Sequence, residues 1–256
     1  MQTDDPNMSR LVVKVGSNVL TRADGTLDVT RVSSLVDQIV RLRETGYEVV
    51  LVTSGAVACG RSVLGPEPDL DDVAQRQVYS AVGQVRLMDL YNTLFNNYRI
   101  KVGQILTVKD NFAEGVAYTN QKACVESMLS IGVLPIVNEN DTVSITELMF
   151  TDNDELSGLI AKMIGAENLI LLTNVDGLFN GSELVRKVLP GEDPSAFIRE
   201  GKSTSGRGGM SSKCSTAMDV AAAGIRVIIA CGKKDGILLS ALSGEPDSAF
   251  TEFVPS

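Results

Sequence analysis

The stretch LVVKVGSNVLTRADGTLDVTRVSSLVDQIVRLRETGYEVVLV, Leu11 to Val52, predicts a strand, a helix and a second strand. It begins with the apolar run Leu11 to Val13 and ends with the run Val49 to Val52, each typical of a buried strand. Between these runs, apolar residues recur at helical spacing until Gly46 ends the helix. The recurring residues are Val32, Leu35, Val36, Ile39, Val40 and Leu42. Two strands joined through a helix indicate a parallel pair.

The same alternation continues along the chain. Three further predicted helices each precede an apolar run: residues 115–131 with 134–137, residues 152 onward with 169–172, and residues 210–223 with 227–230. Strands that alternate with helices and are continuously apolar indicate an α/β fold. We therefore expect a mostly parallel open sheet sandwiched between helices.

Other segments define the expected organisation. Residues 69–98 are predicted to form one long helix that serves as a lid or an oligomer face. Without a repeat or a low-complexity linker, residues 1–256 are interpreted as a single domain. Its two lobes are expected at about residues 1–174 and 175–256. Residues 190–209, rich in Gly, Ser and charge, are predicted to form an exposed mobile loop.

The composition is that of an ordinary globular protein. Of its 256 residues, 44% are hydrophobic and 21% are charged, which excludes a disordered or fibrous chain. No apolar run is long enough to cross a bilayer, and residues 1–7 do not resemble an export signal. The four scattered cysteines signal neither a disulfide framework nor a zinc site. A reducing cytoplasm is therefore the expected location.

Charge and residue usage narrow the chemistry. The formal net charge of −9 repels nucleic acid and anionic membranes, so neither is expected as a partner. The sequence contains no histidine, which removes the usual general base and the commonest metal ligand. Chemistry in this protein must depend on lysine, carboxylates, backbone groups or a bound ion.

Polar residues follow the predicted strands, where an open parallel sheet binds its ligands. These segments are Lys14 to Asn18, Thr53 to Gly55, Asn138 to Asp141, Thr151 to Asp154, and the glycine-rich Ser205 to Lys213. Taken singly, each has a structural explanation as a surface lysine, a helix N-cap or a flexible connection. Their joint occurrence at successive strand ends favours a binding site for an oxyanion.

One apparent motif is rejected. Residues 55–62, GAVACGRS, have the spacing of a P-loop, but Arg61 stands where that motif requires lysine. An arginine fork does not fit that position without rearrangement. A Rossmann glycine motif after a strand and the protein-kinase signatures are also lacking from the sequence.

Six motifs, in order from about residue 11 to residue 236, resemble the amino acid kinase family. They are Lys14-x-Gly16-Ser17-x-x-Leu20, Val52-Thr53-Ser54-Gly55-Ala56, Ala81-Val82-Gly83-Gln84, Val137-Asn138-Glu139-Asn140-Asp141, Asp152-Asn153-Asp154, and Gly208-Gly209-Met210-Ser211-Ser212-Lys213. The lysine and glycine-loop motifs are shared across the family. The Asn-Glu-Asn-Asp and Ala-Val-Gly-Gln strings are similar to its glutamate 5-kinase branch.

The resemblance implies a carbamate kinase-like fold and a set of residue roles. Lys14 and Lys213 would hold the transferring phosphoryl group, and Asp154 would orient them. The residues implied to bind glutamate are Ser54, Asp141 and Asn153. Those implied to bind ATP are Lys14, Thr173, Asn174, Arg207, Gly208, Gly209, Met210, Ser211, Ser212 and Lys213. Mg²⁺ would be carried on the nucleotide phosphates, so no protein metal ligands are assigned.

The resemblance also implies a biological setting. The reaction would convert glutamate to glutamate 5-phosphate, the first step of proline biosynthesis. Proline is expected as a feedback inhibitor, a dimer or tetramer as the assembly, and a glutamate-5-phosphate reductase as a partner. Many relatives append an RNA-binding-type PUA domain, and this chain is expected to be the short form without one.

Two positions depart from the expected pattern and keep alternatives open. Thr151 stands where glycine is expected, and Asn174 where aspartate is expected. The string from Thr173 to Gly177 resembles acetylglutamate and uridylate kinases, which differ in the acceptor. A non-catalytic amino-acid sensor is the alternative from another class, although both lysines and Asp154 are present.

Overall fold

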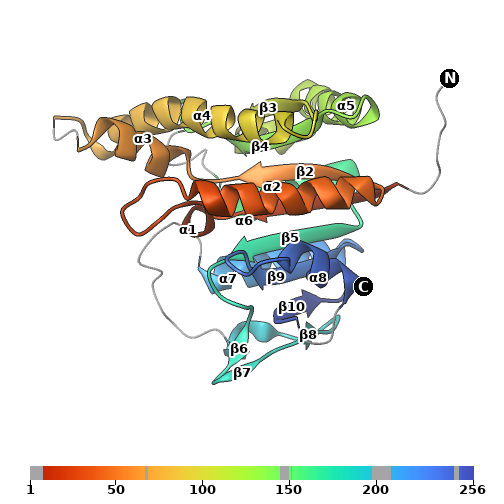
Figure 1. Cartoon of the computed structure of the whole chain (residues 1–256). Coiled ribbons are helices and arrows are strands. Elements are labelled where there is room, and N and C mark those ends of the chain that lie inside the picture. Colours follow the sequence, from red (N-terminus) through yellow and green to blue (C-terminus); the bar gives the residue numbers. More distant parts are fainter. Residues whose placement is uncertain (1–7, 67–68, 145–149, 151, 198–208, 245–247) are drawn as a thin grey trace.

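The computed structural model describes residues 8–66, 69–144, 150, 152–197, 209–244 and 248–256. Figure 1 shows a central sheet with helices on both of its faces. The sheet has eight strands in the order β3-β4-β2-β1-β5-β9-β10-β8. In chain order they are β1 (Ser9–Val15), β2 (Tyr47–Thr53), β3 (Val102–Thr107), β4 (Leu134–Glu139), β5 (Asn168–Thr173), β8 (Lys187–Val188), β9 (Arg226–Cys231) and β10 (Phe250–Phe253). Strands β6 (Phe179–Asn180) and β7 (Glu183–Leu184) form a separate hairpin.

The strand pairing confirms the expected mostly parallel sheet. Strand β1 lies at its centre, where Val12 pairs in parallel with Val50 of β2 and with Leu169 of β5. Among the described strand pairs of this sheet, only β9 and β10 are antiparallel. The central strands are buried on both faces, which explains their unbroken apolar runs.

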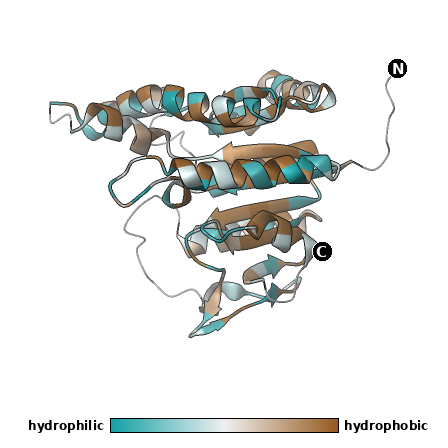
Figure 2. Ribbon diagram, in the orientation of Figure 1, coloured by the Kyte–Doolittle hydropathy of each residue, from teal (hydrophilic) through white to brown (hydrophobic). Residues whose placement is uncertain are grey.

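Two hydrophobic clusters cover the opposite faces of the sheet. On one face, the packed helices are α1 (Ser17–Leu20), α2 (Val29–Glu44), α4 (Asp72–Asn96) and α8 (Ile237–Ser243). On the other face they are α5 (Val116–Ser130), α6 (Asn153–Ile164) and α7 (Met210–Ala222). Helix α3 (Ala56–Leu64) packs on α4. Figure 2 shows the resulting pattern, with brown strands inside and helices such as α2 carrying both apolar and polar faces.

Helix α3 is the main element that the sequence analysis missed. Its packing on α4 requires Gly60 and Gly83, because a Cβ at either position would collide with backbone of the facing helix, at Tyr79 and Ala56 respectively. These two glycines therefore allow an unusually close approach of the two helices. Residues 55–62, rejected above as a P-loop, thus contain a glycine required for helix packing.

The expectation of an exposed loop at residues 190–209 is wrong in part. Pro194–Phe197 form a short 3₁₀ helix, and Pro194 is buried. Helix α7 contacts this 3₁₀ helix, so tertiary packing overrides the loop-like composition. Residues 198–208 lie outside the described residues.

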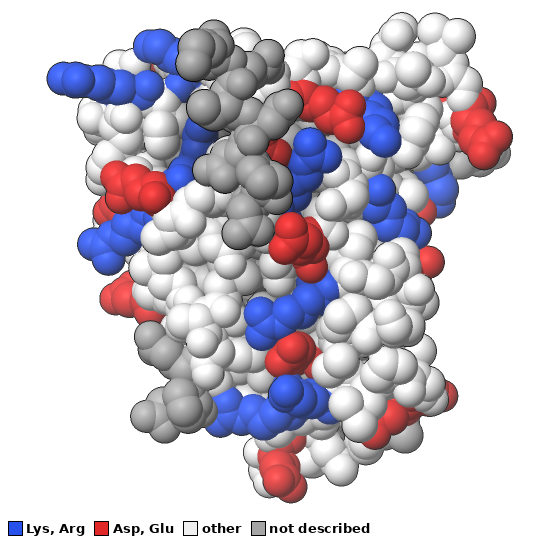
Figure 3. Space-filling view, turned by 90° about the vertical axis from the view of Figure 1, so that its right-hand side faces the viewer, with Lys and Arg blue, Asp and Glu red and all other residues white. Residues whose placement is uncertain are grey.

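In the segments that the structure describes, no helix is both long and apolar enough to cross a bilayer. Figure 3 looks onto the side of the molecule that lies to the right in Figure 1. There, lysines and arginines are interspersed with aspartates and glutamates.

Candidate active site

The carboxyl ends of four neighbouring strands gather the polar segments that the sequence singled out. Thr53 ends β2, Glu139 ends β4 and Thr173 ends β5. The backbone N–H of Gly16, just after β1, donates to the carbonyl of Leu172 at 3.3 Å and thereby fixes the turn into α1. Helices α1, α3 and α6 begin beside this edge, so the positive ends of their dipoles lie there.

Three charged residues from distant parts of the chain meet at this edge. Lys14 Nζ lies 2.5 Å from Asp154 Oδ1, and Lys213 Nζ lies 2.9 Å from Asp154 Oδ2. All three are buried, and Asp154 is 0% exposed. Burial alone would raise the pKa of Asp154, but the two ammonium groups outweigh burial and lower it. The cluster therefore carries one more positive than negative charge, a net cation next to the strand ends.

Asp152 ties the beginning of α6 to that of α7. Its Oδ1 accepts from the backbone N–H groups of Asp154 at 2.9 Å and Glu155 at 3.1 Å, which caps α6. Its Oδ2 accepts from the hydroxyl of Ser212 at 2.6 Å. Burial, followed by the charge of Asp154, raises the pKa of Asp152. These bonds hold Lys213, in the first turn of α7, close to Asp154.

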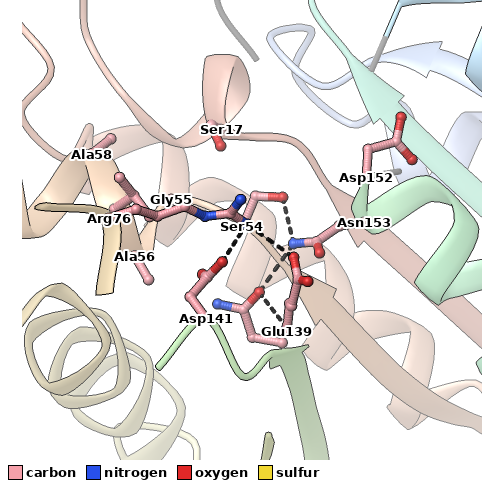
Figure 4. Close-up of a pocket in the computed structure, with 12 residues that line it drawn as sticks. Ser17, Ser54, Gly55, Ala56, Ala58, Arg76, Glu139, Asp141, Asp152 and Asn153 are labelled. Carbon is pink, nitrogen blue, oxygen red and sulfur yellow. Dashed lines mark hydrogen bonds and ion pairs between the residues drawn. The ribbon is translucent and has the colours of Figure 1, made fainter. Parts of the chain in front are cut away.

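A cavity of about 140 Å³ opens beside this cluster (Figure 4). Its lining residues are Ser17, Ser54, Gly55, Ala56, Val57, Ala58, Arg76, Asn138, Glu139, Asp141, Asp152 and Asn153. Gly55, with a left-handed φ of 97°, turns the chain from β2 into α3. The first-turn N–H groups of α3 have no partner within the helix, so the cavity wall at Ala56 and Val57 is rich in donors.

Side-chain amides fix one wall of the cavity. Asn153 Nδ2 donates to Ser54 Oγ at 2.9 Å, to Asn138 Oδ1 at 3.0 Å and to the carbonyl of Thr53 at 2.7 Å. Asn138 in turn donates to Gln84 Oε1 at 2.9 Å. Because Ser54 Oγ accepts from Asn153, the Ser54 hydroxyl hydrogen is oriented away from it and suits an incoming oxygen acceptor.

A second wall carries an arginine and two carboxylates. Arg76 on α4 forms ion pairs with Asp141 and, at 3.1 Å, with Glu139. Burial, followed by the charge of Asp141, raises the pKa of Glu139. Burial also raises the pKa of Asp141, although Arg76 opposes the shift. The second wall thus presents both signs of charge at short range.

The expected nucleotide side is described only in part. Thr173, at the end of β5, donates its hydroxyl to Asn174 Oδ1 at 3.3 Å. Met210, Ser211, Ser212 and Lys213 form the first turn of α7. A Cβ at Gly209, which precedes that turn, would meet no atom within 4 Å. Thr151, Arg207 and Gly208 lie outside the described residues.

Comparison with known proteins identifies the family. The sequence model of the Amino acid kinase family matches residues 9–231. The glutamate 5-kinase of Bacteroides thetaiotaomicron is 54% identical over 254 residues, which cover 97% of this chain and 71% of that protein. The chain belongs to the glutamate 5-kinases of the amino acid kinase family. The glutamate 5-kinase of Chlorobaculum tepidum is 46% identical, with 99% of this chain and 71% of that protein covered.

Solved structures show the same fold at low sequence identity. A carbamate kinase from Giardia lamblia, bound to AMP-PNP, superposes with a TM-score of 0.68 at 17% identity and covers 97% of this chain and 99% of its own. A UMP kinase from Ureaplasma parvum gives 0.65 at 16% identity, with coverages of 97% and 100%. These structures support the carbamate kinase-like fold expected from the sequence.

Arg76 and Glu139 are among the lining residues of this glutamate 5-kinase family member that were missed as functional candidates. Arg76 lies on the long helix that was interpreted only as a lid or an oligomer face. Its signal was present, because Arg76 shares a helical stripe with the buried residues Ser80, Gly83 and Leu87. Glu139 was quoted within a motif but received no role, because a buried glutamate at a strand end has no diagnostic spacing.

Proposed function

We propose that this protein transfers the γ-phosphoryl group of ATP to the side-chain carboxylate of glutamate, giving glutamate 5-phosphate and ADP. The observation that carries the proposal is the convergence of Lys14 and Lys213 on the two oxygens of Asp154. Membership of the glutamate 5-kinases supports glutamate as the acceptor. The resemblance to carbamate and UMP kinases is at 16–17% identity and supports the fold alone.

The absence of histidine is compatible with this reaction. A side-chain carboxylate with a reference pKa of ~4.3 is already ionised at neutral pH, so the nucleophile needs no general base. The difficult part is to bring two anionic reactants into line and to stabilise the charge on the transferring phosphoryl group. The attacking carboxylate oxygen forms the new O–P bond while the bond from phosphorus to the oxygen bridging to ADP breaks.

Lys14 and Lys213 supply the positive charge in this proposal. Opposite unit charges ~4 Å apart attract by about 4 kcal/mol at an effective dielectric of ~20. The two ammonium groups would contact the phosphoryl oxygens, and Asp154 would hold them in fixed positions without cancelling their combined charge. Burial strengthens this effect, because little water screens the three groups.

The cavity would hold the acceptor. Ser54 is oriented to donate a hydrogen bond, and Asn153 fixes that orientation. Asp141 would pair with the α-ammonium group of glutamate, because an acidic side chain attracts the cationic group of the substrate and repels its two carboxylates. The amino acid would thus lie with its side chain directed towards Lys14 and Lys213.

The nucleotide would occupy the neighbouring end of the sheet. We assign to it Lys14, Thr173, Asn174, and residues 207–213. Asp152 and Asp154, the carboxylates nearest the lysines, already bond to Ser212 and to the two lysines. This donor set fits Mg²⁺ carried on the nucleotide phosphates and water, where it neutralises phosphate charge. In the proposed two-lobe division, residues 1–174 bind the amino acid and residues 175–256 bind the nucleotide.

The experiment is an assay of ADP release with glutamate, acetylglutamate or UMP as acceptor, and with hydroxylamine to trap an acyl phosphate. We expect ADP release and hydroxamate formation with glutamate alone. ADP release with UMP or acetylglutamate, but not with glutamate, would contradict the proposal. Binding of glutamate or proline without any turnover would favour an amino-acid sensor.

The wider setting is also proposed from the family. Glutamate 5-phosphate would be the first intermediate of proline biosynthesis and would pass to a reductase. Proline shares the carboxylate and the cationic nitrogen of glutamate, so we propose that it inhibits at the same cavity. We further propose a homodimer or homotetramer in the cytoplasm, a compartment compatible with the four free cysteines. Inhibition that glutamate does not relieve would argue against a shared proline site.

A further inference from the structure

We infer that Arg76 recognises the α-carboxylate of the acceptor and makes this group a requirement for tight binding. The inference rests on the proposed function, because it assigns an additional part of the glutamate site. It gives α4 a role in substrate selection in addition to its packing role.

The cavity lining carries more acidic than basic side chains. Among the described residues that line it, Arg76 is the one with a positively charged side chain, while Glu139, Asp141 and Asp152 carry carboxyl groups. Glutamate brings two carboxylates and one ammonium group. Its side-chain carboxylate is assigned to the lysine cluster, so the α-carboxylate needs a separate cationic partner. Arg76 is the side chain in the lining that provides one.

The geometry of Arg76 suits recognition of a carboxylate. Its Nη2 forms ion pairs with Glu139 Oε2 at 3.1 Å and with Asp141 Oδ1. A guanidinium group has five N–H donors in a planar fork, a shape that matches a carboxylate and can engage more than one of them. The Arg76 side chain is 21% exposed, which leaves part of it accessible. Figure 4 shows its guanidinium group near Ser54 and Asp141, on the cavity side.

The surroundings of Arg76 add further hydrogen-bond donors. The N-terminal turn of α3, at Ala56 and Val57, lines the same cavity and adds N–H donors to those of Arg76. The carboxylates of Glu139 and Asp141 contact the guanidinium group and line the same cavity. An α-amino acid carries adjacent ammonium and carboxylate groups, and this wall presents adjacent acidic and donor-rich regions that complement them.

A purely structural role for Arg76 predicts a different outcome. In that case the arginine only neutralises the two buried acids, and its loss would weaken the site for every acceptor equally. The two roles are separated by 4-aminobutanoate, which is glutamate without the α-carboxylate. A contact between Arg76 and that carboxylate affects glutamate but not this analogue.

The test is calorimetric titration of glutamate and of 4-aminobutanoate into the unaltered protein and into Arg76→Met, Arg76→Lys and Arg86→Met. Arg86 is an exposed arginine on the same helix and serves as the matched control. We expect the unaltered protein and the control to prefer glutamate. Arg76→Met should weaken glutamate binding by about 10- to 100-fold, the value of a charge-assisted hydrogen bond, and leave 4-aminobutanoate binding nearly unchanged. Arg76→Lys keeps the charge without the fork and should lose less.

The possible binding results separate the inference from the proposed function. If Arg76→Met weakens binding of glutamate and of 4-aminobutanoate equally, or changes neither, the inference is overturned. Glutamate turnover by the unaltered protein would still uphold the proposed function in that case. Failure of the unaltered protein to bind glutamate would overturn the proposed function and this inference together. Should Arg76→Met fail to fold, Arg76→Lys decides alone: an unchanged preference ratio would overturn the inference, and a reduced ratio would support it.

Discussion

The ammonium group of Lys14, on the first strand, lies 2.5 Å from Oδ1 of Asp154, in the first turn of α6. Both side chains are almost completely buried. An ion pair removed from water is stable only when its geometry and its further partners compensate for desolvation. Here the further partner is Lys213, which engages the second oxygen of the same carboxylate.

Removal of either lysine should act mainly on the chemical step. We expect Lys14→Ala or Lys213→Ala to lower kcat by roughly 10²- to 10³-fold, by analogy with the loss of one oxyanion donor. Steady-state kinetics of glutamate-dependent ADP release measure this. Lys162→Ala, which removes a lysine that bonds Asp219 on the surface, should leave kcat unchanged. Near-normal turnover in the Lys213 variant would refute its assigned role.

Asp141 should act mainly on binding of the amino acid. We expect Asp141→Ala to raise the KM for glutamate more than it lowers kcat, because the variant loses a partner of the α-ammonium group. The KM for ATP should change little. If the glutamate KM stays constant and the ATP KM rises, Asp141 belongs to the nucleotide site instead.

Ionisation of Glu139 should lower the free energy of unfolding as the pH rises. Burial raises its folded pKa above its ordinary value of 4.5, so the folded state binds the proton more tightly than the unfolded state. The free energy of unfolding therefore falls as the pH rises from 4.5 to the raised pKa. Above that pKa, the loss of stability stays constant. Glu139→Gln cannot ionise, so its stability relative to the unaltered protein should increase from about pH 4 to about pH 8.

Urea unfolding at both pH values measures this difference. Glu114→Gln, which removes an exposed carboxyl group, is measured in parallel as the control. A stability difference between Glu139→Gln and the unaltered protein that is the same at both pH values would contradict the prediction.

The contact between α3 and α4 should tolerate no side chain at Gly83. A Cβ there would collide with the carbonyl of Ala56, so we expect Gly83→Ala to cost about 1–3 kcal/mol of stability or more. Because Ala56 also lines the cavity, the KM for glutamate should rise as well. Gly158→Ala is the matched control within α6. Its nearest atoms are side-chain methyl groups of Val220 and Thr216 at 2.9 and 3.0 Å, which shift more easily than backbone.

Thermal unfolding of the two variants gives the comparison. Equal losses of stability in Gly83→Ala and Gly158→Ala would show that the close backbone contact has no special role.

The central part of the fold was predictable because its signals are local. The runs at Leu11 and Val49 belong to strands buried on both faces, and such strands need no alternation of polar and apolar residues. Strand β3, by contrast, lies at the edge of the sheet and is partly exposed, with Leu106 39% exposed. Its short mixed sequence gave no clear period. Strands β8 and β10 are also short, and only their tertiary pairing defines them.

Helix α3 shows why local propensity fails at close contacts. Gly60 lowers the intrinsic helix propensity of its segment, but the packing against Tyr79 permits no larger residue. Tertiary structure therefore selects the residue that the local preference disfavours.

The site was predictable where it follows strand ends and not where it depends on helix rotation. Lys14 is the penultimate residue of β1 and Ser54 directly follows β2, so topology alone places them near one another. Arg76 lies on α4 and not at a strand end. The direction of its side chain depends on how α4 packs on α3. The sequence shows that such a residue is charged, but it does not show where the side chain points.

The central position of β1 has a consequence for synthesis of the chain. This strand emerges first, yet one of its neighbours, β5, begins at Asn168, and Lys213 follows later still. Chains leave the ribosome from the N-terminus, so Lys14 is made long before Asp154 and Lys213, the other two residues of the cluster. Completion of the three-charge cluster is therefore a late event in synthesis of the chain, and partly made chains lack the phosphoryl-transfer centre that we propose.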